Sequence, residues 1–91
     1  MKRAYISGKI TGRPGHRKDF EVASEIARMR GYEPVSPITD LQMPYWCHMV
    51  RDIALLLTCD TVFFIPTWTD SRGAKIEHSI ATFLHLKIIY L

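Results

Sequence analysis

Short apolar runs alternate along the chain with segments in which apolar residues recur every three or four positions. The short runs predict buried strands, and the helical spacing predicts amphipathic helices. Strands are therefore expected at residues 4–6, 32–35, 61–65 and 87–91. Helices are expected at residues 16–30, from Pro44 onward along an apolar stripe, and at residues 71–86. The stripe of the middle helix consists of Trp46, Met49, Val50, Ile53, Leu56 and Leu57.

Glycine and proline mark the ends of these elements. Gly31 is well placed as the C′ residue of the first helix, and Pro44 as the first residue of the second. Pro34 favours an edge position for the second strand, because proline cannot donate to a central ladder. Pro66 ends the third strand.

The alternation of four strands with three helices predicts a parallel sheet covered by helices on both faces. We expect residues 1–91 to form one α/β domain, a three-layer, flavodoxin- or Rossmann-like sandwich with strand order 2-1-3-4. Ligands of such sheets bind beyond the carboxyl ends of the strands. The loops expected at that edge are residues 7–15, 36–43 and 67–72.

Length and composition indicate a small globular domain. With 91 residues, 47% hydrophobic and 23% charged, the chain can bury one core of marginal stability, which self-association would assist. No apolar run reaches the roughly 18 residues of a membrane span, and no apolar segment follows Lys2 and Arg3 as in a signal peptide. We expect a cytoplasmic protein without membrane association, in which Cys47 and Cys59 are reduced thiols.

The net charge of +3 is unevenly distributed, because residues 1–18 contain no acidic residue. The bases in this segment are Lys2, Arg3, Lys9, Arg13, Arg17 and Lys18. An electropositive end suits an anionic ligand such as a phosphate, although a solvated basic face is an equal alternative. Nucleic-acid binding is not expected, since no known motif or basic helix stripe accompanies the cluster.

Glu77 is the most informative single residue. Its spacing from Gly73, Ala74, Ile80 and Ala81 places it on the helix face that meets the sheet. A carboxylate there is costly unless it is paired or used, and near a helix N-terminus it could serve as a nucleophile. The alternative is that Glu77 turns outward and pairs with a basic neighbour.

Asp52 is the second candidate, because it lies beside the apolar stripe of the middle helix. Two neighbouring carboxylates can take separate roles in the cleavage of a glycosidic bond. One attacks the carbon, and the other transfers the proton. The alternative is a partner for a basic residue within the helix or at the surface.

Ser71 and Gly73 begin the third predicted helix, where a hydroxyl and free backbone N–H groups form an anion site. The alternative, which is the commoner role for such a serine, is a plain N-cap without a ligand. The glycine-rich segment 8–15 lets the backbone approach a phosphate, but it matches neither the Rossmann fingerprint nor a P-loop.

The histidines and aromatic residues give weaker signals. The histidines show no ligand spacing, so neither a metal site nor a cofactor is expected. These histidines are His16, His48, His78 and His85. Trp68 and Tyr45 are placed either to stack on a base or to cover the ends of the sheet.

Three segments, in this order and spread over nearly the whole chain, resemble the nucleoside 2-deoxyribosyltransferase superfamily. They are Tyr5-Ile6-Ser7-Gly8, Asp52 with Leu56-Leu57-Thr58-Cys59-Asp60, and Ser71-Arg72-Gly73-Ala74-Lys75-Ile76-Glu77 with Ala81. The chain looks most similar to a short bacterial and phage branch, marked by Trp46 and by residues 68–74.

The resemblance implies a role for each matching residue. Glu77 corresponds to the glutamate that attacks the anomeric carbon, Asp52 to the aspartate that assists proton transfer, and Tyr5 to the tyrosine that positions the nucleophile. Gly8 and its loop correspond to the segment near the sugar and phosphate. The candidate substrate- and phosphate-binding residues are Ser7, Gly8, Lys9, Ile10, Gly12, Arg13, Arg17, Trp68, Ser71 and Gly73.

Two departures from the family pattern refine this expectation. Ser71 stands where the nucleoside transferases have an aspartate and where the related deoxynucleoside 5′-monophosphate hydrolases have a phosphate-contacting serine, which favours a phosphorylated ligand. The chain ends after its fourth predicted strand, whereas the family enzymes continue to a fifth and share sites between subunits. A homodimer or larger oligomer is therefore expected, while the acceptor-base pocket and catalytic competence stay open.

The leading hypothesis is an N-glycosidase or deoxyribosyltransferase that acts on a deoxynucleoside 5′-monophosphate, or on a deoxynucleoside, through a covalent glycosyl–Glu77 intermediate. One alternative is a nucleotide-binding module of the same fold without catalysis. Another is a protein–protein interaction domain that uses the basic edge and exposed aromatic residues.

Overall fold

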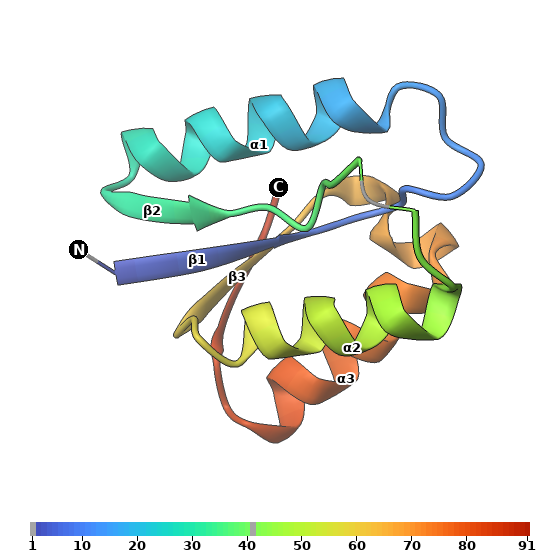
Figure 1. The fold of residues 1–91 in the computed structure, drawn as a ribbon. Helices are drawn as coiled ribbons and strands as arrows, with labels where there is room; N and C mark the ends of the chain where they lie inside the picture. Colours follow the sequence, from blue (N-terminus) through green and yellow to red (C-terminus); the bar gives the residue numbers. More distant parts are fainter. Residues whose placement is uncertain (1, 41) are drawn as a thin grey trace.

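The computed structural model describes residues 2–40 and 42–91 and has the expected alternation of strands and helices (Figure 1). Its elements are β1 (Lys2–Ser7), α1 (His16–Met29), β2 (Tyr32–Val35), α2 (Tyr45–Leu56), β3 (Thr61–Phe64), η1 (Pro66–Asp70), α3 (Arg72–Phe83) and β4 (Lys87–Tyr90). The four strands form one parallel sheet of order β2-β1-β3-β4, which confirms the predicted fold class and strand order.

The helix boundaries follow the sequence signals with small shifts. Gly31 adopts a positive φ of 86° directly after the C-cap Arg30, as expected for a C′ glycine. Pro44 has extended backbone angles and is the N-cap of α2, so it precedes the first helical residue instead of occupying it. The third helix ends at Phe83, short of residue 86, because His85 takes a left-handed φ of 57° that turns the chain into β4.

A short 3-10 helix, η1, lies between β3 and α3 where a loop was expected. Pro66 at its first turn ends β3 as predicted, because proline has no N–H to continue the ladder. This turn lies directly after the third strand and leads the chain to Ser71 at the start of α3.

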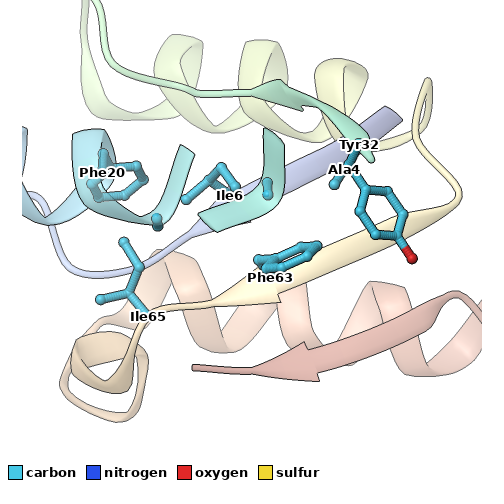
Figure 2. Close-up of a cluster of buried hydrophobic side chains, with 8 residues drawn as sticks. Ala4, Ile6, Phe20, Tyr32, Phe63 and Ile65 are labelled. Atoms are coloured by element: carbon cyan, nitrogen blue, oxygen red, sulfur yellow. The ribbon is translucent and has the colours of Figure 1, made fainter. Parts of the chain in front are cut away.

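Helix α1 covers one face of the sheet, and α2 and α3 cover the other (Figure 1). Alternating side chains of the strands build a separate core on each face. On one face, Ala4, Ile6 and Phe63 pack against α1 (Figure 2). On the other face, the residues between them in sequence pack beneath α2 and α3. This second core consists of Tyr5, Val35, Leu56, Cys59, Val62, Phe64 and Ala81.

Only half of the apolar stripe predicted for α2 is turned inward, because Met49 and Ile53 are half-buried and Leu56 is buried. Leu56 is the one buried residue of α2, whereas Trp46, Val50 and Leu57 of the predicted stripe are exposed. The helix is instead rotated so that Met49 and Asp52 point toward the carboxyl edge of the sheet, where they line a cavity.

Both cysteines are free thiols, with Cys59 buried and Cys47 half-buried. Among the residues that the structure describes, every helix is too short or too polar to cross a bilayer.

Candidate active site

The carboxylate of Glu77 faces inward, between α3 and the end of β1. Its Oε2 accepts a hydrogen bond of 2.6 Å from the Tyr5 hydroxyl, and its Oε1 accepts one of 2.8 Å from the Ser7 hydroxyl. Tyr5 and Ser7 are two positions apart on β1, so both side chains project from the sheet face that α3 covers. The side chain of Glu77 is thereby held at both oxygens, and the residue is only 5% exposed.

A cavity of about 760 Å³ opens beside Glu77 at the carboxyl ends of the strands. All three loops expected at this edge contribute to its wall, together with residues of α1, α2 and α3. Residue 41 of the second loop lies outside the described residues. The volume falls within the range of about 300–1,000 Å³ typical of small-molecule sites.

Burial makes Glu77 a weak acid. Desolvation and, to a smaller extent, the charge of Asp52 raise its pKa, the hydrogen bonds from Tyr5 and Ser7 lower it, and the net value is about 7. Desolvation and the charges of Glu77 and Asp52 also raise the pKa of Tyr5, so its hydroxyl stays protonated and donates. Near neutral pH, Glu77 is therefore poised between its protonated and ionised forms.

Asp52 lies on α2 and lines the same cavity. Desolvation raises its pKa to about 6, while the positive charges of Arg51 and His48 lower it. One nitrogen of Arg51, Nη1, donates to the Asp52 Oδ1 at 3.3 Å and to the carbonyl of Pro37 at 3.1 Å. Arg51, which the sequence did not single out, therefore ties Asp52 to the loop that follows β2.

Close packing fixes the loop after β1. A Cβ atom at Gly8 would lie 3.0 Å from the Ile65 Cβ, so this approach admits only glycine without a shift of its neighbours. The backbone N–H of Lys9 donates to the Thr67 Oγ1 at 3.1 Å, which anchors the loop to η1. Gly8, Lys9 and Ile10 thereby form one wall of the cavity.

The start of α3 forms another wall. The Ser71 Oγ accepts from the backbone N–H of Ala74 at 3.1 Å, so Ser71 is the N-cap of the helix and also lines the cavity. A Cβ atom at Gly73 would lie 3.2 Å from the Met49 Sδ and 3.3 Å from the Tyr45 Oη. Gly73 therefore lets the N-terminal turns of α2 and α3 approach each other closely.

Two of the basic residues predicted near the site form salt bridges with aspartates. Arg13 forms a two-pronged salt bridge with Asp19, at 2.6 and 3.2 Å, and lies outside the cavity wall. Arg17 lines the cavity but pairs with Asp40, another lining residue. Two of the six bases of the expected electropositive edge are thus paired with aspartates.

Three other predicted binding residues also lie outside the wall, namely Ser7, Gly12 and Trp68. The ring of Trp68 stacks on His78 with centroids 4.4 Å apart and contacts Phe64 and Tyr90. Of the two uses considered for Trp68, this packing corresponds to covering the end of the sheet.

The wall also contains residues that sequence reasoning had not placed at the site. His48 and Met49 share one helical face of α2 with the predicted residues Tyr45 and Asp52, and this spacing of three and four was the available signal. The other additions come from loops and helix ends, where no periodicity identifies them. They are Thr11, His16, Pro37, Ile38, Thr39, Asp40, Gln42, Asp70, Arg72 and Ala74.

Within the described ranges, no three His, Cys, Asp or Glu side chains are grouped so that they could hold a metal ion.

Comparisons with known proteins support the fold. A family model described as a domain of unknown function (DUF4406) matches residues 2–90. Among solved structures, a 2-desoxiribosyltransferase from Leishmania mexicana superposes with a TM-score of 0.78 at 14% sequence identity. The match covers all of this chain and 64% of that one, and it confirms the expected nucleoside 2-deoxyribosyltransferase-like fold. A search of curated proteins found no match.

Replacing Tyr5 with phenylalanine is expected to raise the pKa of Glu77 above about 7, because the lost hydrogen bond favours the ionised carboxylate. A titration followed by carboxyl carbon-13 NMR measures this change. Tyr90→Phe is the matched control, since the Tyr90 hydroxyl contacts His78 instead. An unchanged Glu77 pKa in Tyr5→Phe would contradict the assigned hydrogen bond.

Glu77→Gln is expected to stabilise the fold at alkaline pH. The folded-state pKa of Glu77 lies above its ordinary value of 4.5, so folding takes up a proton and the wild type loses stability as the pH rises from about 4.5 to about 7. The difference amounts to about 3 kcal/mol near pH 8 and vanishes near pH 4. Urea denaturation at both pH values tests this, with exposed Glu21→Gln as the control. Equal stability of wild type and Glu77→Gln near pH 8 would argue against a raised pKa.

Proposed function

The chain belongs to the family described as a domain of unknown function (DUF4406), and we propose that it cleaves the N-glycosidic bond of a deoxynucleoside 5′-monophosphate or deoxynucleoside. The observation that carries this proposal is the buried Glu77 carboxylate, held by Tyr5 and Ser7 beside a cavity of ligand size. The resemblance to nucleoside 2-deoxyribosyltransferases in fold, and the deoxyribosyltransferase named in the structural match, point to the same class of substrate.

In the proposed first step, a Glu77 oxygen attacks the anomeric carbon of the sugar. A covalent glycosyl ester forms as the C–N bond breaks, and the base departs with the bonding electrons. Each Glu77 oxygen accepts one hydrogen bond in the protein, which leaves a second lone pair available for attack. The same two hydrogen bonds limit rotation of the carboxylate, so little orientational freedom is lost on reaction.

Asp52 is the proposed proton donor to the departing base. Its raised pKa of about 6 leaves a minor protonated fraction near neutral pH, which a carboxyl group in water would lack. Because the pKa of Glu77 is higher, at about 7, the reactive form with Glu77 ionised and Asp52 protonated is the less populated of the two forms that carry one proton. The arriving substrate would displace water from the cavity and favour the neutral acid further. Arg51 acts as a positioning residue, because it holds the Asp52 oxygen and the loop at Pro37 with one nitrogen.

In the second step, water or an acceptor base attacks the anomeric carbon and the glycosyl–Glu77 bond breaks. Asp52, now ionised, takes the proton of the attacking water. With water the products are the free base and the deoxyribose or its 5-phosphate, and with a second base the product is a new nucleoside or nucleotide. Both residues return to their starting protonation states.

A 5′-phosphate is the group that we expect to distinguish the preferred substrate from an unphosphorylated nucleoside. Ser71 at the N-terminus of α3 and the cations Lys9 and Arg72 line one cavity, which suits a phosphate at a helix N-terminus. Arg13 and Arg17 contribute less to this argument than the sequence implied, because each pairs with an aspartate.

The activity test is a chromatographic assay for released base. Purified protein is incubated with each deoxynucleoside 5′-monophosphate and each deoxynucleoside, with and without an acceptor base. Wild type is expected to release or exchange base. The rate of Glu77→Gln is expected to be at least about a thousandfold lower, because the nucleophile is lost. The control Glu21→Gln, which changes an exposed residue, is expected to keep the wild-type rate. Mass spectrometry with a 2-fluoro nucleotide analogue, which slows breakdown of the ester, is expected to show the sugar on the Glu77 peptide.

Either of two results would remove the proposal. Turnover by Glu77→Gln at the wild-type rate would exclude Glu77 as the nucleophile. Nucleotide binding by a folded wild type that releases no base from any substrate would favour the non-catalytic binding module.

Ser71→Asp tests the phosphate separately. Aspartate is an equally good N-cap, so the helix should keep its stability, but its charge should repel a phosphate. The KM for a monophosphate is expected to rise about tenfold or more, which corresponds to about 1.4 kcal/mol, while that for the unphosphorylated nucleoside changes little. Steady-state kinetics with both substrates measures the difference. An equal change for both substrates would place the phosphate elsewhere.

A further inference from the structure

The side chain of Arg3 is half-buried and unpaired within the described part of the chain. Its Nε is the one buried side-chain nitrogen or oxygen there that lacks a hydrogen-bond partner. Glu33 is the neighbour of Arg3 in the β1–β2 register, yet none of the salt bridges among the described residues includes Arg3. Buried donors are nearly always paired, because an unpaired one has lost its hydrogen bonds to water without replacement. Arg3 therefore calls for an acceptor from outside the chain.

A cavity of about 570 Å³ lies beside Arg3 at the edge of the sheet where the strands begin, and we call it the amino-edge cavity. Its wall consists of Lys2 and Arg3 of β1 and of residues 57–60, which connect α2 to β3. Figure 1 shows this connection on the same side of the molecule as the start of β1, away from the loops of the candidate active site. No described residue lines both cavities, so the two are separate.

The charges of this wall favour an anion. Lys2 and Arg3 supply two positive charges, and Asp60 supplies one negative charge. Asp60 is exposed and its carboxylate accepts from the Thr61 hydroxyl at 3.3 Å, so solvent and this bond weaken its repulsion of a ligand. Both cations belong to the basic first segment of the sequence, but they lie at the opposite end of β1 from the candidate active site. The proposed reaction therefore leaves them without a role.

The helix end beside the amino-edge cavity has paired carbonyl groups. The Leu55 carbonyl accepts from the backbone N–H and from the hydroxyl of Thr58, at 3.1 and 2.6 Å. The Leu56 carbonyl accepts from the backbone N–H of Cys59 at 3.0 Å. The negative pole of a helix resides on the unpaired carbonyls of its last turn, so this pairing reduces the repulsion between α2 and an anion.

The two cations provide the donor types that bind phosphate. A guanidinium presents a planar fork of N–H donors that matches two phosphate oxygens, and the Lys2 ammonium adds a mobile point charge. The volume of the amino-edge cavity lies within the range of about 300–1,000 Å³ for small-molecule sites. Two cations at one cavity also differ from the row of basic side chains that follows a nucleic-acid backbone. These features favour a single phosphate group on a small molecule.

We propose that the amino-edge cavity binds the phosphate group of a small molecule, with the Arg3 Nε–H and the Lys2 ammonium as donors. The bound phosphate supplies the acceptor that the protein does not give to Arg3. It also stabilises this small 91-residue domain, because β1 and the α2–β3 connection build the wall only in the folded chain. The proposal is independent of the reaction proposed for Glu77, which lies at the other edge of the sheet.

An NMR titration of the Arg3 Nε–H with inorganic phosphate tests the proposal. The signal is assigned by triple-resonance experiments at mildly acidic pH, where guanidinium protons exchange slowly with water. In wild type it is expected to shift saturably, with a dissociation constant on the order of 1 mM for a few charge-assisted hydrogen bonds at an open site. The backbone N–H signals of residues 58–60 should follow the same curve. Sodium chloride at matched ionic strength should leave the Arg3 signal in place.

Charge-removing variants separate the two donors from the general charge of the protein. Arg3→Gln is expected to abolish the backbone shifts, and Lys2→Gln to raise the dissociation constant about three- to fivefold. Arg30→Gln is the matched control, because Arg30 at the end of α1 lies outside the amino-edge cavity, with its guanidinium 5.8 Å from the centre of the Phe63 ring. It should bind phosphate as wild type does. Ser71→Asp, designed to repel phosphate from the candidate active site, should also leave the Arg3 titration unchanged.

Four results would each overturn the proposal. An Arg3 Nε–H that does not shift with phosphate, or shifts equally with chloride, would leave water as the partner of this nitrogen. A phosphate shift that Ser71→Asp removes would originate in the candidate active site. Equal weakening by Arg30→Gln and Lys2→Gln would indicate a general effect of charge. Saturation by a single-stranded oligodeoxynucleotide, without saturation by phosphate, would assign the two cations to nucleic acid. These readings use the wild-type and Lys2→Gln proteins, so they hold whether or not Arg3→Gln folds.

Discussion

The burial of one carboxylate between β1 and α3 is the constraint on which the rest of the site depends. Glu77 accepts from Tyr5 and Ser7, and these two hydroxyls lie on the sheet face that α3 must cover. Burial nevertheless raises the pKa of Glu77 to about 7, so the two hydrogen bonds do not fully compensate for the lost water. The resulting cost of about 3 kcal/mol at alkaline pH is large against the 5–15 kcal/mol that stabilise a typical domain. A leucine at this position would avoid it, which is why the arrangement indicates function in preference to stability.

The same carboxylate determines which residues must be small or polar around it. Ser7, buried at the end of β1, has a polar partner because Glu77 supplies one. Gly73, one helical turn before Glu77, leaves room for Met49 and Tyr45 and so brings α2 alongside. Asp52 of α2 then lies near enough to raise the pKa of Glu77 by its charge. These local packing contacts therefore bring two acids, Asp52 and Glu77, to the same cavity.

The elements and the inward orientation of Glu77 were predictable because they depend on short-range periodicity. The parallel sheet and the loops at the ligand edge followed from the alternation of strands and helices. Periodicity failed for α2, because a helix that is apolar on several sides has no single face that must meet the sheet. The salt-bridge partners of Arg13 and Arg17 could not be predicted from the sequence either. Which acid lies near a long exposed side chain depends on the final geometry of the loops. Arg51 was missed for the same reason, because its acceptor at Pro37 is a backbone carbonyl.

The rotation of α2 gives this helix two sides with different surroundings. Tyr45 lines the cavity, while its neighbour Trp46 is exposed to solvent. The sheet secures the helix through Leu56, which lies one helical turn after Asp52. Two further contacts secure it beside the cavity, the approach of Tyr45 and Met49 to Gly73 and the Arg51 bridge to Pro37. The position of Asp52 relative to Glu77 therefore depends on contacts on both sides of Asp52 along the helix.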